Sequence, residues 1–473
     1  MTKYSAEEQH KRMTETPIPK IVTAMALPTT AIQLISVLYN SADTFFVGKI
    51  NNSASAAVGA AFSLLSLIQA LSFGLGMGAS SLISRRLGAK DNEAADKYFS
   101  SAITCEAAVG LFIFIFGLIF LKPLMKLLGA TETMLPYSCA YAKYIVLFAP
   151  FNCLSFCLNV SLRAEGRATF SAIGMCSGSI LNMILDPLFI FGFHMGTGGA
   201  GLATGIGQFT SFLILLVPFL RKQTALRFGT RKISRKGKDY LDIIRTGLPT
   251  ICRQGVASVA SALLNNAVVR MDMVKWGGAA NAAEGENLRD AAVSAITIAN
   301  KIYTLVRSVI LGIGQGFQPV AGYNYGAGKK DRVRKAFTFT TMVGTAIGTV
   351  AAVVLAIFAK EAVGLFRNDP DVIRFGAPAV IYLAACLPFL AYSTYVNQMY
   401  QCLGFSLPAT VLACCHQGIF YIPLILFLPK LLGILGCELT QPIADLLTFA
   451  VSVPFQVRFF RKQLSGAGKL NLN

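Results

Sequence analysis

Two aspartates stand inside long apolar stretches of this 473-residue chain, where an ionised side chain is costly unless it faces a cavity or a partner. Asp43 lies toward the outer end of the first stretch, which covers residues 20–48. Asp186 follows Asn182 by four residues, so the carboxylate and the amide share one face of a helix. Pro187 is expected to kink that helix and to free carbonyl oxygens, because it lacks a backbone N–H. These residues are the first candidates for a functional site.

The chemistry of these candidates depends on whether the fold brings Asp43 and Asp186 together. Two carboxylates in one pocket could share a proton, because two like charges side by side are unfavourable. The same oxygens suit a hard cation, so a Na⁺ site at Asp43, Asn182 and Asp186 is the second possibility. The sequence leaves H⁺ and Na⁺ open as the coupling ion and predicts no other cofactor. For Asp43 alone, the alternative is a solvated position at the end of its helix.

The elements that carry these residues are predicted to cross a membrane. Hydrophobic residues make up 54% of the chain and charged residues 14%, whereas soluble domains carry roughly 25% charged residues. Apolar runs recur along the chain, and about 20 helical residues cross the ~30 Å hydrocarbon core. The runs do not alternate with period two, so helices are expected rather than a barrel. We expect twelve spans, at residues 20–48, 55–83, 99–121, 138–162, 169–193, 200–220, 241–269, 290–318, 334–358, 375–402, 406–429 and 432–457.

The positive charge of the chain, +19 in total, is concentrated in the loops on one side of the predicted membrane. About two thirds of the 42 Lys and Arg residues fall on the side that holds both termini, which the positive-inside rule assigns to the cytoplasm. We therefore expect a multi-pass protein of the cell inner (plasma) membrane with cytoplasmic termini and no nucleic-acid partner. The 11 cysteines and three histidines are scattered, so no structural metal site is predicted.

The two halves of the chain repeat one another. The run Gly74-Leu75-Gly76-Met77-Gly78 stands ten residues before Gly88, and Gly312-Ile313-Gly314-Gln315-Gly316 stands ten before Gly326, 238 positions later. Each repeat holds six expected spans, which predicts an all-α membrane protein with 12 transmembrane helices in two six-helix bundles related by a parallel pseudo-two-fold repeat. The predicted segments are a cytoplasmic N-terminal tail (1–19), an N-terminal bundle (20–220), a cytoplasmic linker (221–240), a C-terminal bundle (241–460) and a cytoplasmic tail (461–473).

The second half does not repeat the two aspartates, since the matching positions hold Leu264 and Leu424. We therefore expect ion coupling to belong to the first half, and amides and cations to occupy the second. Lys301 is expected near mid-membrane, where snorkelling is hard, so a substrate or gating role and a structural pairing are equal alternatives. The residues expected to line a substrate cavity are Asn40, Asn159, Gln254, Asn265, Lys301, Arg307, Gln315, Gln318 and Gln398.

Several further motifs carry a family resemblance: Ala42-Asp43-Thr44-Phe45-Phe46-Val47-Gly48, Leu162-Arg163-Ala164-Glu165-Gly166, Asn182-Met183-Ile184-Leu185-Asp186-Pro187, Gly199-Ala200-Gly201-Leu202-Ala203-Thr204 and Gly314-Gln315-Gly316-Phe317-Gln318-Pro319. With them the chain resembles the multidrug and toxic compound extrusion (MATE) family over residues 20–460. The resemblance implies a V-shaped pair of bundles that exports drugs, often cationic, against H⁺ or Na⁺. It implies an ion site in the first bundle at Asp43, Tyr141, Asn182, Asp186 and Thr204. Some members also use acidic residues of the second bundle, where span seven here offers Arg253 and Gln254 instead.

The leading functional interpretation is a secondary active multidrug efflux antiporter, a monomer that moves small-molecule substrates across the lipid bilayer by alternating access. A flippase for lipid-linked oligosaccharides is the alternative within the same superfamily, modestly favoured by Arg253, Lys301 and Arg307 because such flippases have basic cavities. A channel is less favoured, since no filter-like segment is evident. An enzyme is not predicted, because neither a clustered catalytic set nor a GxxxxGK[ST] motif occurs.

Overall fold

The computed structural model describes residues 6–50, 52–269 and 282–464, and every regular element in these ranges is a helix. The chain begins with a short helix, α1 (Ala6–Glu15). The first half contains α2 (Ile18–Gly48), α3 (Asn52–Gly88), α4 (Asn92–Ile119), α5 (Leu121–Leu127), α6 (Leu135–Leu147), α7 (Ala149–Ala164), α8 (Ala168–Pro187), the π-helical turn η1 (Leu188–Gly192) and α9 (Gly196–Leu220). The second half follows a short turn, η2 (Thr230–Lys232), and contains α10 (Gly237–Val269), α12 (Ala282–Gly326), α13 (Lys330–Ile357), α14 (Ala359–Phe366), α15 (Pro370–Ala385), α16 (Leu387–Cys402), α17 (Ser406–Cys414), the π-helical turn η3 (Cys415–Ile419), α18 (Tyr421–Leu432), α19 (Ile434–Phe459) and η4 (Phe460–Leu464).

Nine helical segments in the described ranges are long and apolar enough to cross a membrane. Two more crossings are bent pairs, α6 with α7 and α15 with α16, which turn by 52° and 46° at their breaks. Helix α10 has 33 residues, and the charged residues in its first turns, Lys238, Asp239, Asp242 and Arg245, explain why it is the most polar of the long helices. These segments account for the twelve expected spans, and the predicted all-α membrane fold is confirmed.

The internal repeat is visible in the helix ends. Helix α13 begins and ends 238 residues after α4, and both contain 28 residues. The bend between α6 and α7 lies at Phe148, and the bend between α15 and α16 lies at Cys386, again 238 residues later. Pro150 and Pro388 stand in the first turn of the second piece of each pair, where a missing N–H is tolerated. The backbone therefore carries the duplication inferred from the sequence.

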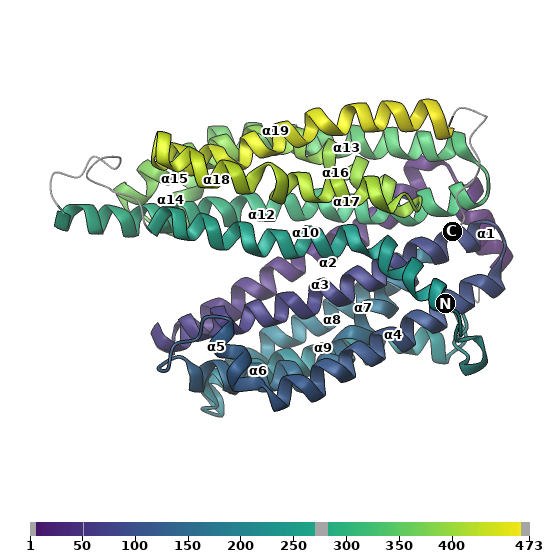
Figure 1. Ribbon diagram of the computed structural model, residues 1–473, viewed down its shortest axis with the longest axis horizontal. Coiled ribbons are helices and arrows are strands. Elements are labelled where there is room, and N and C mark those ends of the chain that lie inside the picture. The colour runs from purple at the N-terminus through teal and green to yellow at the C-terminus, as the bar shows by residue number, and fades with distance from the viewer. Residues whose placement is uncertain (1–5, 51, 270–281, 465–473) are drawn as a thin grey trace.

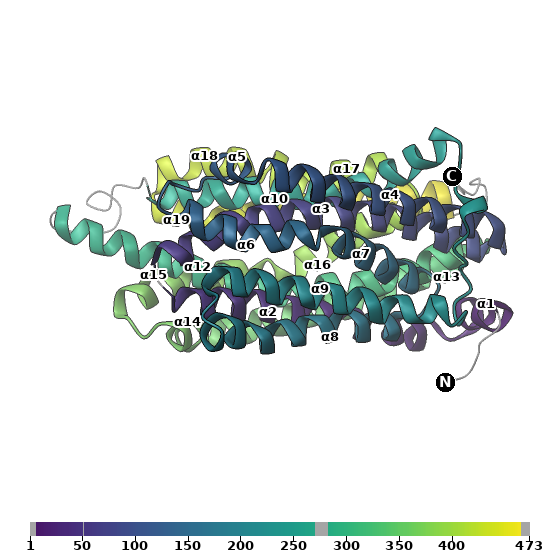
Figure 2. The ribbon, with the colours of Figure 1, turned by 90° about the horizontal axis from the view of Figure 1, so that it is seen from below.

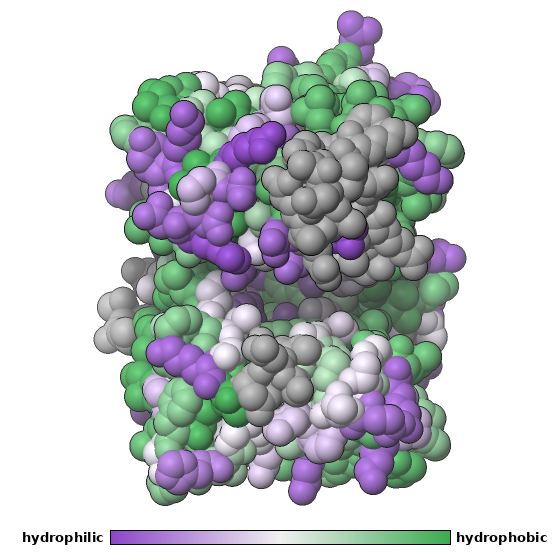
Figure 3. All heavy atoms as spheres, turned by 90° about the vertical axis from the view of Figure 1, so that its left-hand side faces the viewer, coloured by the Kyte–Doolittle hydropathy of each residue, from purple (hydrophilic) through white to green (hydrophobic). Residues whose placement is uncertain are grey.

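The two halves lie side by side, and α1 and both chain termini are at one end of the molecule, which we call the terminal end (Figures 1 and 2). Helix α2 packs against α12, and α3 packs against α10, across the boundary between the halves. Near the terminal end a Cβ on Gly88 would overlap the backbone of Tyr323, and one on Gly326 would overlap that of Arg85. At the opposite end, which we call the far end, the surface is hollowed between the halves (Figure 3). The molecule is thus closed at the terminal end and open at the far end.

Helix α1 joins the two halves at the terminal end. The side-chain amide of Gln9 donates to the carbonyl oxygen of Glu165 in the first half at 2.6 Å. Asn324 of the second half donates to the carbonyl oxygen of Met13 at 3.0 Å, and the Met13 side chain is fully buried. The segment expected to be a polar tail therefore includes a helix that contacts both halves.

Glu165 anchors the segment that connects the halves. Its carboxylate accepts hydrogen bonds from the backbone N–H groups of Ala225 (2.8 Å) and Leu226 (3.4 Å), and the Arg167 guanidinium lies 3.6 Å away. Glu165 follows the last residue of α7 and is completely buried. Burial raises the pKa of its carboxyl group to about 7.

We expect the stability of the protein to fall with rising pH, in part through Glu165. Its raised pKa means that ionisation costs more in the folded protein than in the unfolded chain. Its contribution to the free energy of unfolding is therefore full below about pH 4.5 and is lost as the pH rises through about 7. Melting temperatures from circular dichroism in detergent, measured between about pH 5 and about pH 7.5, should fall less steeply for Glu165→Gln. The exposed-site control Glu132→Gln should keep the wild-type slope, and identical slopes in all three proteins would contradict this role.

Candidate ion-binding site beside a cavity between the halves

A cavity of about 270 Å³ lies between the two halves. Its wall is formed by α2, α3, α7, α8 and α9 of the first half and by α10 and α12 of the second. Most of its lining side chains are amides, hydroxyls or arginines, mixed with a few aromatic rings. The lining residues that the sequence singles out are Asn40, Asn182, Thr204, Arg253, Gln254, Arg307 and Gln315.

The five residues predicted to bind the coupling ion gather at the first-half wall of this cavity, where Asn182 and Thr204 line it and the other three lie behind them. The Tyr141 hydroxyl donates to the Asp43 carboxylate at 2.7 Å, joining α6 to α2. The Asn182 amide lies 3.3 Å from the Asp186 carboxylate and 3.2 Å from the Thr204 hydroxyl, joining α8 to α9. Asp43 is 1% exposed and Asp186 is 0% exposed, so the solvated alternative for Asp43 does not apply. The two carboxylates are close enough for their charges to repel each other.

Local sequence features position this network. Helix α8 ends at Pro187 and continues as the π-helical turn η1, a distortion that occurs often at functional sites. Glycines bring α8 and α9 together, since a Cβ on Gly178 would overlap the carbonyl oxygen of Gly207. The close crossing places Asn182 beside Thr204, whose hydroxyl also donates to the Ala200 carbonyl at 3.0 Å.

Three buried oxygens of the network receive no hydrogen bond from any described residue. They are Oδ1 of Asp43, Oδ1 of Asn182 and Oδ2 of Asp186. Buried carboxylates without a cationic partner are unfavourable, so this oxygen set is suited to a bound proton or to a hard cation such as Na⁺. The residues present therefore fit either coupling ion. No group of three or more His, Cys, Asp or Glu side chains in the described ranges could hold a metal ion.

The other residues predicted for the substrate cavity lie elsewhere. Asn159 is buried in α7 away from the cavity lining. Gln318 and Gln398 are buried within the second half, where the Gln318 amide donates to the Gln398 carbonyl oxygen at 3.5 Å. Lys301 is exposed on α12 and does not line the cavity. The side chain of Asn265 lies outside the described residues.

Arg163 contacts a residue of the cavity wall, although the sequence predicts that it lies in the loop between the spans at 138–162 and 169–193. Helix α7 extends to Ala164, so Arg163 lies within the helix and is 3% exposed. Its guanidinium donates to the Gln315 side-chain oxygen at 2.7 Å, which links α7 to α12 across the two halves. The sequence alone does not show whether an arginine near a helix end is buried with a hydrogen-bond partner or solvated in a loop.

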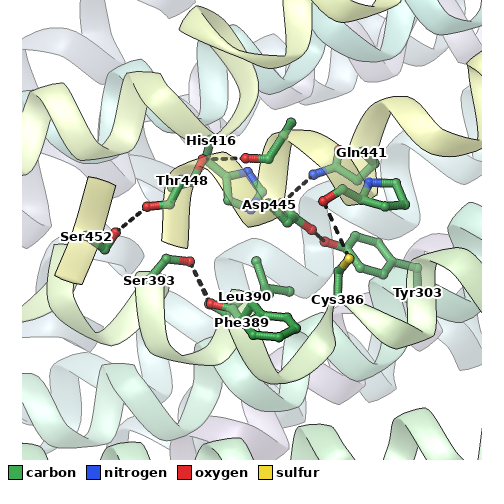
Figure 4. Close-up of polar contacts among 12 residues, drawn as sticks. Tyr303, Cys386, Phe389, Leu390, Ser393, His416, Gln441, Asp445, Thr448 and Ser452 are labelled. Atoms are coloured by element: carbon green, nitrogen blue, oxygen red, sulfur yellow. Dashed lines mark hydrogen bonds and ion pairs between the residues drawn. The ribbon is translucent and has the colours of Figure 1, made fainter. Parts of the chain in front are cut away.

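The expectation that the second half lacks membrane carboxylates is wrong. Asp445 of α19 is 0% exposed and accepts hydrogen bonds from the Tyr303 hydroxyl and the Gln441 amide, both at 2.8 Å (Figure 4). His416 Nε2 in η3 lies 3.0 Å from the same carboxylate. Two more buried acids that the sequence reading overlooked are Glu438 of α19 and Glu106 of α4. The repeat gives no signal for Asp445, because the equivalent position in the first half holds Gly207 and not an acidic residue.

The internal repeat explains where the His416–Asp445 pair comes from. Subtracting the repeat length of 238 places His416 at Gly178 and Asp445 at Gly207, the two glycines at which α8 and α9 cross. In the first half these glycines line the cavity. In the second half the same crossing is filled by a buried histidine and carboxylate. We therefore infer that the His416 and Asp445 side chains have a packing role, because they fill the space that is part of the cavity in the first half.

We expect Asp445→Asn to lower the stability of the protein without abolishing ion-coupled transport. Removing one partner of a buried hydrogen-bonded pair destabilises a protein by about 1–3 kcal/mol, because the remaining polar groups lose their partner. The melting temperature should fall by several degrees, and His416→Gln should lower it to a similar extent. The exposed-site control His194→Gln should leave it unchanged. If Asp445→Asn kept the wild-type melting temperature and lost coupling, the packing role would be refuted.

Comparison with known proteins decides the family. The sequence profile of the MatE family matches residues 28–188 and 286–427, which is more than half of the chain. The chain belongs to the MatE family. The resemblance inferred from its motifs is therefore confirmed.

Relatives and solved structures of this MatE family member extend over nearly its full length. Multidrug export protein MepA of Staphylococcus haemolyticus (strain JCSC1435) is 27% identical over 440 residues, which cover 93% of each chain. MepA of Staphylococcus aureus (strain MSSA476) is 27% identical over 441 residues, again 93% of each chain. A solved multidrug resistance MATE family transporter of the MOP superfamily, in an outward-facing conformation, matches with a TM-score of 0.87 at 24% identity, over 95% of this chain and 98% of that one. These matches agree with the two-bundle fold.

Proposed function

We propose that this protein is a multidrug efflux antiporter that exports amphipathic organic compounds in exchange for H⁺ or Na⁺. The observation that carries the proposal is the pair of buried carboxylates, Asp43 and Asp186, which lie behind one wall of a cavity between the halves. Neither has a cationic partner among the residues that the structure describes. Membership of the MatE family and the names of the MepA relatives, which are multidrug export proteins, support the export of drugs.

Exchange of ion for substrate follows if the two bind alternately at the same wall of the cavity. Asn182 and Thr204 line the cavity and belong to the carboxylate network, so an ion at Asp186 is one side chain away from a substrate. Binding H⁺ or Na⁺ neutralises the carboxylates and removes their attraction for a positively charged group of the substrate. The ion thereby favours substrate release, and substrate binding favours ion release.

The orientation of the chain assigns the open end of the molecule to one side of the membrane. Both termini are assigned to the cytoplasm because the Lys and Arg residues are concentrated on their side. The closed terminal end is then the inner end and the hollow opens outward, in a protein of the cell inner (plasma) membrane. Alternating access requires the α2–α12 and α3–α10 contacts to separate at the inner end. A single chain supplies both walls of the cavity, which supports a monomeric unit.

A flippase for lipid-linked oligosaccharides is the second candidate, because Arg253 and Arg307 line the cavity and would attract a pyrophosphate group. The cavity volume of about 270 Å³ is near the lower limit for drug-sized ligands and small for an oligosaccharide headgroup. Drug export therefore remains the preferred function.

Reconstitution into liposomes tests this proposal. Fluorescent organic dyes of different charge should move across the membrane only when a pH or Na⁺ gradient is imposed, and an ionophore that dissipates the gradient should stop them. A rate of dye transport that depends on neither the pH gradient nor the Na⁺ gradient would refute coupling of transport to these ions. Movement of a labelled lipid-linked sugar without dye transport would favour the flippase.

A further inference from the structure

The charges on the cavity wall are distributed unevenly between the two halves. Arg253 of α10 and Arg307 of α12 are the only charged side chains among the described residues that line the cavity, and both belong to the second half. The first half contributes amides and hydroxyls, including Asn182 and Thr204. Two acids on that side, Asp43 and Asp186, lie behind these residues and are buried.

Neither arginine has an anionic partner in the part of the chain that the structure describes. Within the described ranges, the ion pairs involve other residues, and neither Arg253 nor Arg307 donates a side-chain hydrogen bond. Both are only half-exposed, and their charges are close enough to repel each other. By contrast, Arg163 donates a hydrogen bond to the Gln315 side-chain oxygen at 2.7 Å. A guanidinium group forms its strongest contacts with carboxylate or phosphate oxygens, so this pair of arginines is suited to an acidic group supplied from outside the chain.

The wall opposite the arginines can accept an aromatic body and a positive charge. The rings of Phe73 and Phe156 line the cavity and pack edge to face, with centroids 5.8 Å apart. Tyr39 adds a third ring on the same wall. The side-chain oxygen of Asn182, Oδ1, receives no hydrogen bond from a described residue. The amide nitrogen of the same side chain lies 3.3 Å from the Asp186 carboxylate. This side of the cavity is therefore electronegative when the coupling ion is absent.

We propose that the cavity selects zwitterionic aromatic compounds, which place an acidic group at Arg253 and Arg307 and a cationic group at the Asn182 wall. This inference rests on the proposed export function and names its substrate class. The arginines hold the acidic group whatever the ionic state of the carboxylates. The cationic group competes with H⁺ or Na⁺ for the field of Asp43 and Asp186, which preserves exchange. A purely cationic drug would face two unpaired arginines and bind less tightly.

Two rhodamine dyes provide a matched pair of probes. Rhodamine 110 carries a free carboxyl group beside its cationic ring system, and rhodamine 123 is the methyl ester of the same compound. Purified protein in lipid nanodiscs should bind rhodamine 110 about tenfold more tightly than rhodamine 123, measured by fluorescence anisotropy. Arg253→Gln and Arg307→Gln should each weaken rhodamine 110 binding about tenfold and leave rhodamine 123 binding unchanged or tighter.

Control variants separate a binding role from a structural one. Arg231→Gln removes the same charge from an exposed site in η2, in the segment that connects the halves, and should leave both dissociation constants unchanged. Arg253→Lys keeps the positive charge and should retain part of the preference for rhodamine 110. Melting temperatures of all variants show whether they are folded.

The inference is overturned if wild-type protein binds rhodamine 123 as tightly as rhodamine 110, if it binds neither dye, or if the arginine variants weaken both dyes equally. These outcomes are distinguishable from failure of the proposed function. Gradient-driven transport of rhodamine 123, together with no preference for rhodamine 110, would keep the exporter and remove the zwitterion preference. Tight, arginine-dependent binding of rhodamine 110 without any gradient-driven movement would refute export and keep the binding site.

Discussion

Replacing Asp186 by asparagine is expected to reduce gradient-driven export at least about 100-fold, because the substitution removes the charge that a coupling ion neutralises. Asp186 is fully buried, has one oxygen without a donor, and lies 3.3 Å from the amide of Asn182. Asparagine has nearly the same size, so the helix packing should be preserved. Asp43→Asn should have a similar effect, and Tyr141→Phe a smaller one, since Tyr141 only orients the Asp43 carboxylate at 2.7 Å.

The measurement is the initial rate of dye export from liposomes under an imposed gradient, with dye binding measured in parallel. Binding of the dye should survive in Asp186→Asn, because the arginines and aromatic rings of the cavity are unchanged. Asp371→Asn, which removes an exposed carboxylate at the start of α15, should export at the wild-type rate. Full gradient-driven export by Asp186→Asn and Asp43→Asn would show that coupling resides elsewhere in the chain.

A single methyl group on α10 is expected to impair transport at least about tenfold. In Gly247→Ala the new Cβ would overlap the carbonyl oxygen of Gly74, where α10 and α3 cross between the halves. Backbone atoms cannot give way as a flexible side chain can, so the two helices must separate. The closed inner end would then be destabilised, and the equilibrium would shift away from the outward-open state.

Helix α10 supplies its own control for this prediction. Gly255 lies two turns further along the same helix, and a Cβ there meets no atom within 4 Å. Gly255→Ala should therefore transport at the wild-type rate and melt at the same or a slightly higher temperature. Equal transport rates for Gly247→Ala and Gly255→Ala would mean that close packing of α3 on α10 is not required for the transport cycle.

The long helices could be predicted from the sequence because lipid leaves few alternatives. Apolar stretches in a bilayer must form helices of about 20 residues, and charged residues mark their ends. The same rule also produced an error. Arg163 reads as a loop residue, yet it is buried in α7 because Gln315 from the other half accepts its hydrogen bond. Such a partner is known only when the two halves are seen together.

The candidate site could be predicted only in part. The spacing of Asn182 and Asp186 places them on one face of a helix, and the structure places Asp43 nearby. The addition of Tyr141 and Thr204 depended on family resemblance, since no spacing rule joins α6 and α9 to these positions. Asp445 and His416 were overlooked because they lie at positions where the first half has glycines, so the repeat offers no acidic residue to match.

The two halves are therefore alike in backbone and different in chemistry. The first half leaves its α8–α9 crossing open beside a cavity and places two carboxylates behind it. The second half fills the equivalent crossing with His416 and Asp445 and presents two arginines to the cavity. This division is the basis on which we propose ion binding in the first half and a part in substrate selection for the second.

Substrate-driven ion movement is the most direct test of ion exchange at Asp43 and Asp186. Liposomes containing the protein are loaded with substrate, without any imposed ion gradient, and the internal pH and internal Na⁺ are followed as the substrate leaves. We predict that substrate efflux drives H⁺ or Na⁺ into the vesicles, and that Asp43→Asn and Asp186→Asn abolish this ion uptake. Substrate efflux at the wild-type rate with no movement of either ion would contradict the account.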